Sequence, residues 1–200
     1  MPTRTSRKER IVSAAVRCYV ENGVAETTMS QIAQRAKVDQ PLIHYYFPDV
    51  DGLYREVFLV VLESLKEASV KPFALPTKNT AKTLATYIEA PFRWADREPG
   101  LFSVWMYFYY LSSFHALQRQ LNTDIRRTGR ERIAVMIYQG IEEGVFKIPA
   151  GSNVQDTALM IQGLITGNTI LAQTEDIQER DQLMSQTVTA AYRLLGYSKR

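Results

Sequence analysis

Hydrophobic residues recur along the chain three and four positions apart, which is the spacing of amphipathic helices. Alternating apolar and polar runs bounded by turn residues, which would indicate strands, are absent from the sequence. The pattern therefore predicts an all-helical protein. The expected helices run over about 7–22, 28–37, 39–47, 49–69, 80–97, 99–113, 116–143, 154–174 and 177–195. Pro72 and Pro76 predict a loop after the fourth of them.

The first three expected helices form a module of their own. Thr28 and Gln31 have the spacing of a capping box at the start of the second helix. Asp39 stands where a cap for the third helix is expected, with Pro41 in the first turn. The buried stripe of the first helix is expected to consist of Ile11, Ala14, Ala15, Cys18 and Tyr19. Two short helices joined by a tight turn and braced by a longer one make a helix-turn-helix.

The net positive charge is concentrated in this module. Residues 1–48 contain seven Lys and Arg against four Asp and Glu, whereas residues 49–200 contain seventeen of each. The whole excess in the formal net charge of +3 therefore lies in the first quarter of the chain. A basic module attached to a neutral body suits a protein whose N-terminal end meets a polyanion such as DNA.

A helix-turn-helix presents the first residues of its second helix to base edges in the major groove. Ile43 and Phe47 are expected to face the core of the module, which leaves the other positions of that helix outside. Gln40 can pair with adenine, and Pro41 or Leu42 can contact a thymine methyl group. The start of the preceding helix offers hydroxyl and N–H donors to phosphate. The predicted DNA-contacting residues are Arg4, Arg7, Lys8, Thr28, Ser30, Lys37, Gln40, Pro41, Leu42, His44 and Tyr45.

Several of the predicted DNA contacts are also compatible with a purely structural role. Gln40 is also compatible with a solvated first-turn residue, Tyr45 with a core aromatic, and the basic N-terminal run with a solvated chain end. Cys18 is expected in the core rather than as a redox sensor, because sensor thiols need exposure and a charged neighbourhood. The combination of helix spacing, charge and polar positions favours DNA binding.

Aromatic residues gather in the middle of the chain, where seven of the twenty-one lie between Leu101 and His115. Wound as a helix, residues 101–111 are apolar or aromatic around their full circumference, so this segment is expected to be buried or to line a cavity. Tyr and Trp carry polar tips that need partners, which makes a ligand pocket the sharper hypothesis and core packing the alternative for any single residue. The predicted ligand-lining residues, which are large and adaptable, are Trp94, Phe102, Trp105, Met106, Tyr109, Tyr110, Met136 and Met160.

The last two expected helices carry apolar stripes with small residues. The stripe positions are Ala158, Ile161, Leu164, Ile165 and Leu171 on one helix and Leu183, Val188, Ala191, Leu194 and Leu195 on the other. Gly163 and Gly167 are four residues apart and permit a close approach of helices. The two helices are expected either to form a homodimer interface or to pack within the chain.

The composition and the motifs of the chain bear on whether it is a metalloprotein, a membrane or secreted protein, or an enzyme. A single cysteine, Cys18, excludes an intrachain disulfide and a thiolate zinc cluster, and the two histidines leave little material for a metal site, so no cofactor or metal is expected. The longest apolar run, 104–111, is too short to span a membrane, and the basic N-terminus lacks the apolar core of a secretory signal. We expect a cytoplasmic protein without a membrane partner. No Walker loop, Gly-x-Ser-x-Gly elbow, HExxH or dinucleotide fingerprint is present, so no enzyme is expected.

About a quarter of the chain resembles a known family. The segments RIVSAA at 10–15, YVENG at 19–23, TTMSQIA at 27–33, VDQPLIHYYF at 38–47 and Leu53 resemble the N-terminal signature of the tetracycline-repressor (TetR) family. The resemblance implies an all-helical homodimer with a DNA-binding head and a variable C-terminal body. The body is implied to hold a ligand cavity and to form the dimer's four-helix bundle through its last two helices. Segments 105–108, 117–121 and 130–144 resemble the choline-sensing subgroup, which implies a cationic ligand held by aromatic faces.

The chain departs from the family pattern at three positions. Lys37 replaces a common glycine, His44 a common tyrosine, and Val50 a lysine that grips a phosphate in the family. The expected organisation is a helix-turn-helix domain at 1–47 and a helical ligand-binding and dimerisation domain at 48–200. The expected function is a homodimeric repressor that a small apolar, aromatic or cationic effector releases from a double-stranded operator. The alternative is a helical protein-interaction module with a degenerate DNA-binding head.

Overall fold

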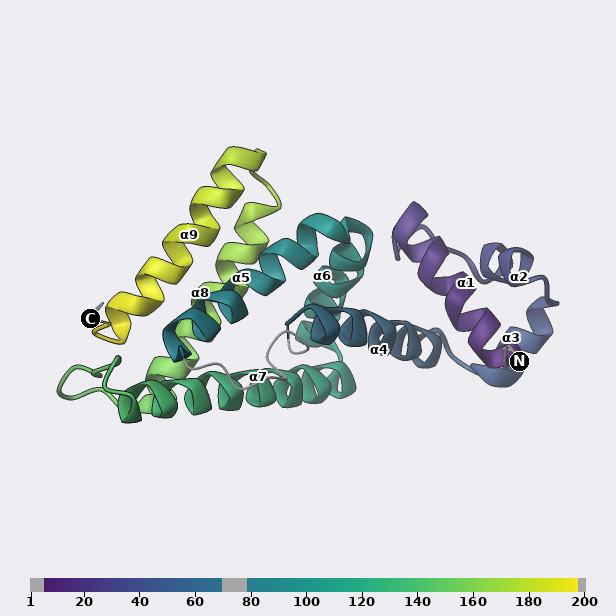
Figure 1. The fold of residues 1–200 in the computed structure, drawn as a ribbon. Helices are drawn as coiled ribbons and strands as arrows, with labels where there is room; N and C mark the ends of the chain where they lie inside the picture. The colour runs from purple at the N-terminus through teal and green to yellow at the C-terminus, as the bar shows by residue number, and fades with distance from the viewer. Residues whose placement is uncertain (1–5, 70–78, 198–200) are drawn as a thin grey trace, which may run out of the picture. The chain divides into compact units, whose positions relative to one another are not determined.

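The computed structural model describes residues 6–69 and 79–197, and every regular element in these ranges is an α-helix (Figure 1). The helices are α1 (Arg7–Asn22), α2 (Met29–Ala36), α3 (Gln40–Tyr46), α4 (Val50–Ser69), α5 (Thr80–Arg97), α6 (Pro99–Phe114), α7 (Ala116–Glu142), α8 (Val154–Ala172) and α9 (Ile177–Leu194). The all-helical prediction is confirmed. None of these helices combines the length and the apolar character that crossing a bilayer requires. Pro72 and Pro76, predicted to lie in a loop, are outside the described residues.

Local capping interactions set the ends of the first helices. Ser6 and Glu9 form a reciprocal capping box at the start of α1, and Gly23 ends that helix with a φ of 84°. The predicted box at α2 is present, because the Gln31 amide N–H donates to Thr28 Oγ1 at 3.3 Å and the Thr28 N–H donates to Gln31 Oε1 at 2.7 Å. Asp39 occupies the cap position of α3 but its carboxylate makes no capping hydrogen bond, which corrects the expectation of a side-chain cap.

The chain divides into two compact units. The first combines the chain up to Ser64 with residues 98–114, so it contains α1, α2, α3, most of α4 and α6. The second combines residues 65–97 with the chain from His115 onward and contains α5, α7, α8 and α9. The predicted helix-turn-helix domain at 1–47 lies inside the first unit. The boundary after residue 47 remains a prediction.

The core of the first unit forms around α1 and α4. The stripe predicted for α1 is buried throughout, and Cys18, only 2% exposed, is part of the core. Phe58 of α4 stacks on Phe108 of α6 with ring centroids 3.5 Å apart. The Tyr54 hydroxyl donates a hydrogen bond of 2.9 Å to the Val104 carbonyl, which joins the same two helices in the buried interior. Burial raises the pKa of the Cys18 thiol, which keeps it protonated and inert.

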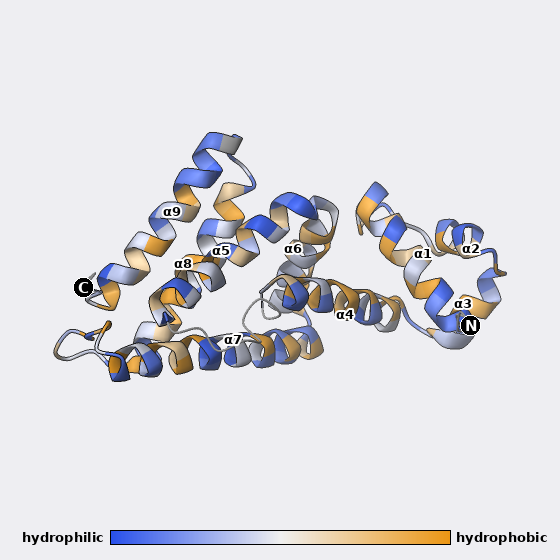
Figure 2. Ribbon diagram, viewed as in Figure 1, coloured by the Kyte–Doolittle hydropathy of each residue, from blue (hydrophilic) through white to orange (hydrophobic). Residues whose placement is uncertain are grey.

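The second unit has a separate core. Hydrophobic and hydrophilic residues alternate along α7 (Figure 2), and its apolar positions Ile133 and Ile137 are buried with Leu84 of α5 and Ile161 of α8. The Tyr192 hydroxyl donates to the Ala81 carbonyl at 2.8 Å, which connects α9 to α5. Each helix therefore turns one apolar face inward, as the spacing predicts.

Helix α6 is only partly buried. Phe102, Val104 and Phe108 lie in the core, as expected for a helix that is apolar all round. Tyr110 and Phe114, however, are 58% and 67% exposed. The expectation that the whole circumference of residues 101–111 is buried or lines a cavity is therefore wrong for Tyr110. Apolar composition alone does not determine which positions of a helix its neighbours cover.

Candidate nucleic-acid interface

Helix α3 separates an anchoring face from an exposed one. Ile43 and Phe47 are 0% and 3% exposed and fix the helix to the core of the first unit, as their spacing predicts. The exposed predicted contact residues are Gln40, Pro41, His44 and Tyr45, and Leu42 is half-buried. Tyr45 is 77% exposed, so the alternative of a core aromatic is wrong for this residue. The helix thus presents an amide, an imidazole and a phenol outward, which are the groups that hydrogen-bond base edges and phosphates.

The start of α2 is also exposed. The Thr28 hydroxyl is engaged within the cap, where it donates to Gln31 Oε1 at 3.0 Å and accepts the Gln31 amide N–H at 3.3 Å. Ser30 is exposed on the first turn of the same helix. A phosphate at this end would therefore meet the Ser30 hydroxyl and the unpaired N–H groups of the first turn. The capping bonds of Thr28 hold this turn in place.

The basic residues at the start of α1 differ in their surroundings. Arg7 is exposed. Lys8 instead pairs with Glu56 of α4, with Nζ 2.9 Å from Oε1, and lies over the Phe47 ring at 5.7 Å from its centroid. Lys8 therefore ties α1 to α4 and holds the anchoring aromatic of α3. Arg4 lies outside the described residues.

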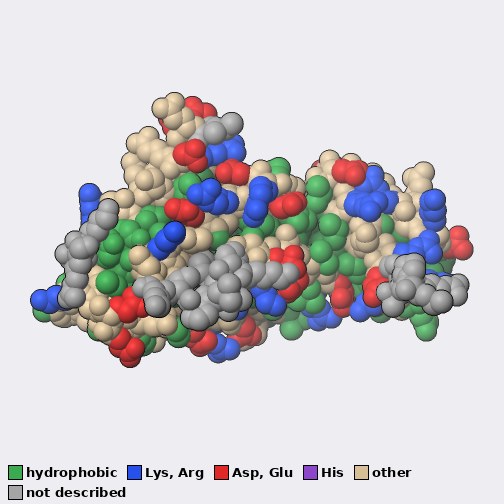
Figure 3. Space-filling model, in the orientation of Figure 1, with side chains coloured by type: hydrophobic (Ala, Val, Ile, Leu, Met, Phe, Trp, Pro, Cys, Tyr) green, Lys and Arg blue, Asp and Glu red, His purple; other side chains and the backbone are tan. Residues whose placement is uncertain are grey.

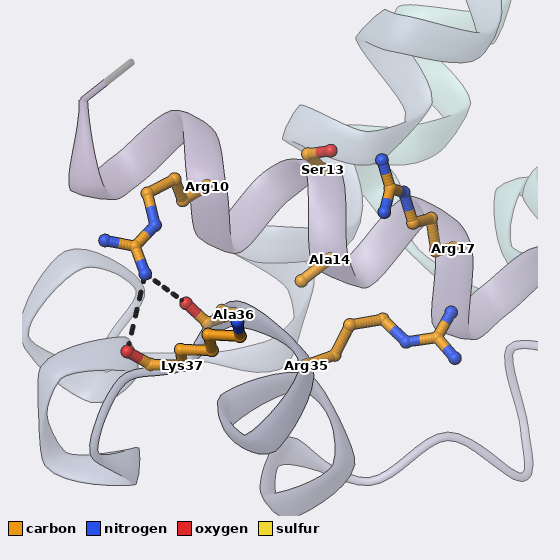
Figure 4. Close-up of a pocket in the computed structure, with 7 residues that line it drawn as sticks. All are labelled: Arg10, Ser13, Ala14, Arg17, Arg35, Ala36 and Lys37. Atoms are coloured by element: carbon orange, nitrogen blue, oxygen red, sulfur yellow. Dashed lines mark hydrogen bonds between the residues drawn. The ribbon is translucent and has the colours of Figure 1, made fainter. Parts of the chain in front are cut away.

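A basic groove of about 300 Å³ lies between α1 and the end of α2. Its four cationic side chains are Arg10, Arg17, Arg35 and Lys37 (Figure 4). Arg10 and Lys37 lie at one end of the groove and Arg17 and Arg35 at the other. On the face drawn in Figure 3, Lys and Arg side chains lie over the part of the molecule that carries α1 and α2. Only Lys37 of the four was predicted as a DNA contact.

The spacing of Arg10 and Arg17 could have indicated the groove, although neither of them nor Arg35 was predicted as a DNA contact. Arg10 and Arg17 are seven residues apart, which places them on one face of α1. Arg35 stands near the end of α2 and forms an ion pair with Glu21. Its hydrogen bond lowers the pKa of the Glu21 carboxyl, so this acidic neighbour stays ionised and offsets one of the four cations. The groove keeps a net positive charge. Lys37, at one of its ends, lies three residues before Gln40, the first residue of α3.

A second cavity of about 410 Å³ lies within the second unit, between α5, α7 and the end of α4. Met136, which the sequence predicts as a ligand-lining residue, lines it together with Tyr87 and Arg132. Burial raises the pKa of the Tyr87 phenol, against the opposing effect of the Arg132 guanidinium, so the phenol stays a donor at neutral pH. Ser69 also lines the cavity, and its Oγ is buried without a hydrogen-bond partner. An unpaired buried hydroxyl in an apolar cavity is free to bind a ligand.

The other predicted ligand-lining residues are scattered. Trp94 and Phe102 are core residues, 2% and 6% exposed. Tyr110 and Met160 are exposed at 58% and 55%. The half-buried members are Trp105, Met106 and Tyr109. The set divides between the two units, so the structure brings only part of it together, and a ligand role for each residue remains a prediction. Among the described residues there is no cluster of three or more His, Cys, Asp or Glu side chains that could hold a metal ion.

Comparison with known proteins agrees with this geometry. Residues 11–57 match the family model described as bacterial regulatory proteins, tetR family. The HTH-type transcriptional regulator BetI of Burkholderia ambifaria is 26% identical over 118 residues, which cover 59% of this chain and 61% of that protein. BetI of Burkholderia thailandensis is also 26% identical, over 59% of this chain and 60% of that protein. The chain therefore matches about three fifths of the length of these curated relatives.

Solved structures share the fold over nearly the whole chain. A transcriptional regulator from Saccharomonospora viridis, solved in complex with choline, superposes with a TM-score of 0.80 at 20% identity and covers 98% of this chain and 100% of that one. A transcriptional regulator from Rhodococcus sp. superposes with a TM-score of 0.78 at 12% identity over the same shares. The family match lies on α1 to α4, where the exposed recognition helix and the basic groove are found. Residues 11–57 therefore match the tetR family of bacterial regulatory proteins, and the chain shares its overall fold with these solved regulators.

Proposed function

We propose that this protein is a transcriptional regulator that binds a double-stranded DNA operator as a homodimer and is released from it by a small-molecule effector. One observation carries the proposal: α3 is anchored by Ile43 and Phe47 while Gln40, Pro41, His44 and Tyr45 stay exposed beside a groove of four cations. An operator lies on the chromosome, so the proposed place of action is the cytoplasm. The chemistry needed is recognition rather than catalysis.

Recognition divides between the two exposed regions. The first turn of α3 enters the major groove, where Gln40 reads an adenine and Pro41 packs against a thymine methyl group. The start of α2 and the basic groove contact the phosphate backbone, which sets the register without reading sequence. Arg7 adds a further phosphate contact from the start of α1.

Fluorescence anisotropy with a labelled duplex tests DNA binding. The protein is titrated into its own upstream region and into a scrambled duplex at several salt concentrations. Gln40→Ala is expected to reduce the preference for the specific duplex, because it removes a base contact. Arg7→Ala is expected to weaken binding to both duplexes and to reduce the salt slope by about one. Absence of salt-sensitive binding at micromolar protein would overturn the proposal.

The cavity beside Met136 is the proposed site of a small apolar, aromatic or cationic effector. A ligand that fits better when α4 is displaced would favour dimers whose recognition helices are misplaced for successive major grooves. Choline is the first compound to test, since a protein of the same fold was solved with it. Thermal shift should detect binding, and Met136→Ala should reduce it. Effectors that stabilise the protein and leave DNA affinity unchanged would contradict this coupling.

An exposed face on α8 supports the homodimer. Leu159, Met160 and Leu171 are exposed apolar residues of this helix. A Cβ atom added at Gly163 or Gly167 would meet no atom within 4 Å, so the chain itself does not use these glycines for close packing. A second copy of the chain can approach closely there. Gly163→Glu should give a folded monomer in sedimentation velocity, and a dimer that persists in this variant would place the interface elsewhere.

A protein-interaction module with a degenerate head is the second candidate. Val50, at the start of α4, favours it because the residue is 57% exposed at the position where the family carries a phosphate-gripping lysine. Val50→Lys separates the two candidates. If the head binds DNA, the added cation should strengthen binding to any duplex several-fold. If the head is degenerate, the variant and the natural chain should both fail to bind in the anisotropy titration.

A further inference from the structure

The first unit contains a cavity that is lined in part by Tyr107 and Leu111, which belong to the aromatic segment of α6. Its volume is about 400 Å³, and it lies between the loop after α1, the start of α2, the start of α4, and α6. Three tyrosines from three different helices line it, Tyr19, Tyr54 and Tyr107, together with the carboxylate of Asp51. The volume is in the range of small-molecule sites. None of the residues predicted to bind a ligand lines this cavity.

One wall of the cavity carries a tyrosine hydroxyl that has no partner among the described residues. Tyr19 is 3% exposed, and its hydroxyl forms no hydrogen bond with the described residues. The neighbouring Tyr54 hydroxyl, in contrast, donates to the Val104 carbonyl at 2.9 Å. Burial raises the pKa of Tyr19 to about 12, so this phenol is protonated at neutral pH. The Tyr19 hydroxyl is therefore available to hydrogen-bond a group that enters the cavity.

The charge and the aromatic geometry of the wall select one class of ligand. No lysine, arginine or histidine is found among the described residues that line the cavity, whereas Asp51 contributes a carboxylate. The Tyr54 and Tyr107 rings meet edge to face, with centroids 5.7 Å apart and planes at 76°. The Tyr19 and Tyr54 ring centroids are 6.0 Å apart, with their planes at 52°. Aromatic faces close to a carboxylate attract a desolvated cation and repel an anion.

We infer that this cavity is a binding site for a small organic cation that also hydrogen-bonds the Tyr19 hydroxyl. The site differs from the effector cavity beside Met136, because all of its described lining residues belong to the first unit. The cation lies against the tyrosine rings with its charge near Asp51. An ammonium N–H or a ligand hydroxyl completes the hydrogen bonding of Tyr19.

The position of the cavity connects it to DNA recognition. Thr28 and Met29, the cap and first residue of α2, line it, and so does Val50 at the start of α4. A ligand there changes the free energy of placing the start of α2, where the proposed phosphate contacts lie. The effect of the ligand on DNA binding rests on the proposed function, whereas binding of the cation itself does not.

Isothermal titration calorimetry on the full chain tests the site with 2-phenylethylammonium as the probe and 2-phenylethanol as its neutral counterpart. The ammonium compound is expected to bind and the alcohol to bind at least about tenfold more weakly, because the alcohol lacks the charge that the rings and Asp51 attract. Asp51→Asn and Tyr107→Leu should each weaken binding of the cation about fivefold, and Tyr19→Phe about threefold. Equal affinity for the two compounds would overturn the inference.

Glu26→Gln is the matched control, since it removes an exposed carboxylate of the loop after α1 that does not line the cavity. This variant should bind the cation as the natural chain does. Unchanged affinity in both Tyr19→Phe and Tyr107→Leu would place the cation elsewhere and overturn the site, whatever the folding of Asp51→Asn. Anisotropy with labelled DNA then measures the coupling: the cation should change DNA affinity in the natural chain, and Tyr107→Leu should need about fivefold more cation for the same change. A protein that binds the cation but no DNA would leave the site standing and overturn the proposed function.

Discussion

The guanidinium of Arg10 donates a hydrogen bond of 2.6 Å to the backbone carbonyl of Ala36, the last residue of α2. The same nitrogen lies 3.4 Å from the Lys37 carbonyl. The carbonyls at the end of a helix have no partners within it, so a cation from α1 satisfies them and secures the turn of the helix-turn-helix. Arg10 therefore stabilises the turn that leads from α2 into α3.

Replacing Arg10 by Met should loosen this turn. Arg10→Met keeps most of the aliphatic stem and removes the charged donor, so the free energy of unfolding of the head should fall by about 1 kcal/mol. Urea denaturation and hydrogen exchange of the α2 amides measure the loss. Arg17→Met is the matched control, because Arg17 lies on the same face of α1 and makes no such bond to the turn. Equal stability of the two variants would contradict a structural role for Arg10.

Lys37 adopts a backbone conformation that favours glycine. Its φ is 52°, and it is the only non-glycine residue with a positive φ among the described residues. Lys37→Gly should raise the free energy of unfolding by about 1 kcal/mol, because glycine has no Cβ to clash in the left-handed region. The same variant should weaken DNA binding by removing a cation from the groove. Lys37→Ala should show the weaker DNA binding without the gain in stability, and thermal denaturation separates these effects.

Arg17 should contribute to DNA binding without contributing to folding. Its side chain lies at the end of the groove away from Lys37 (Figure 4). Arg17→Met should lower affinity for specific and scrambled duplexes alike and reduce the salt slope by about one. Anisotropy titrations at several salt concentrations provide the slope. A slope equal to that of the natural chain would show that phosphates do not reach this part of the groove.

The helix ends and the orientation of α3 could be predicted from local sequence. Capping partners lie within a few residues of each other, as Thr28 and Gln31 do, and the pair Ile43 and Phe47 defines a buried face by spacing alone. Long-range contacts leave no such local signal. The bond from Arg10 to Ala36 joins residues 26 positions apart, and the Lys8–Glu56 pair joins residues 48 apart.

Cavities were the least predictable feature for the same reason. The residues around the head cavity come from several separate segments, and their composition does not distinguish a cavity wall from a packed core. The aromatic run in α6 led to a predicted pocket, yet Tyr110 faces outward and Phe102 is core. Hydropathy shows which side chains favour burial, but the packing of neighbouring helices decides which of them are covered.

Alkaline pH should destabilise the first unit through its buried tyrosines. Burial raises the pKa of Tyr19 from 10.0 to about 12 and that of Tyr54 further in the same direction. The folded state therefore holds its phenol protons more tightly than the unfolded chain. The resulting stability is complete below pH 10 and is lost as the pH rises from 10 to about 12. Tyr19→Phe should reduce the slope of unfolding free energy against pH in this window, and urea titrations at intervals above pH 9 measure it. An unchanged slope would mean that Tyr19 titrates as an unfolded tyrosine does.

Two threonines of α8 should differ in how the same substitution changes the free energy of unfolding. Thr169 is 3% exposed, and its Oγ1 is buried without a hydrogen-bond partner. Thr157 is 4% exposed, and its hydroxyl donates to the Asn153 carbonyl at 2.8 Å. Valine has nearly the same shape as threonine, so each change mainly removes a hydroxyl. Thr169→Val should leave the free energy of unfolding unchanged or raise it by up to about 1 kcal/mol, because an unpaired polar group no longer has to be buried.

Thr157→Val should lower the free energy of unfolding by about 1 kcal/mol, since it breaks a bond made at the start of the helix. Comparing the two variants in one helix cancels the common effect of valine on helix propensity. Thermal denaturation of both, with the natural chain as reference, gives the difference directly. A loss of stability in Thr169→Val as large as that in Thr157→Val would show that the Thr169 hydroxyl has a partner in solution, such as a buried water molecule.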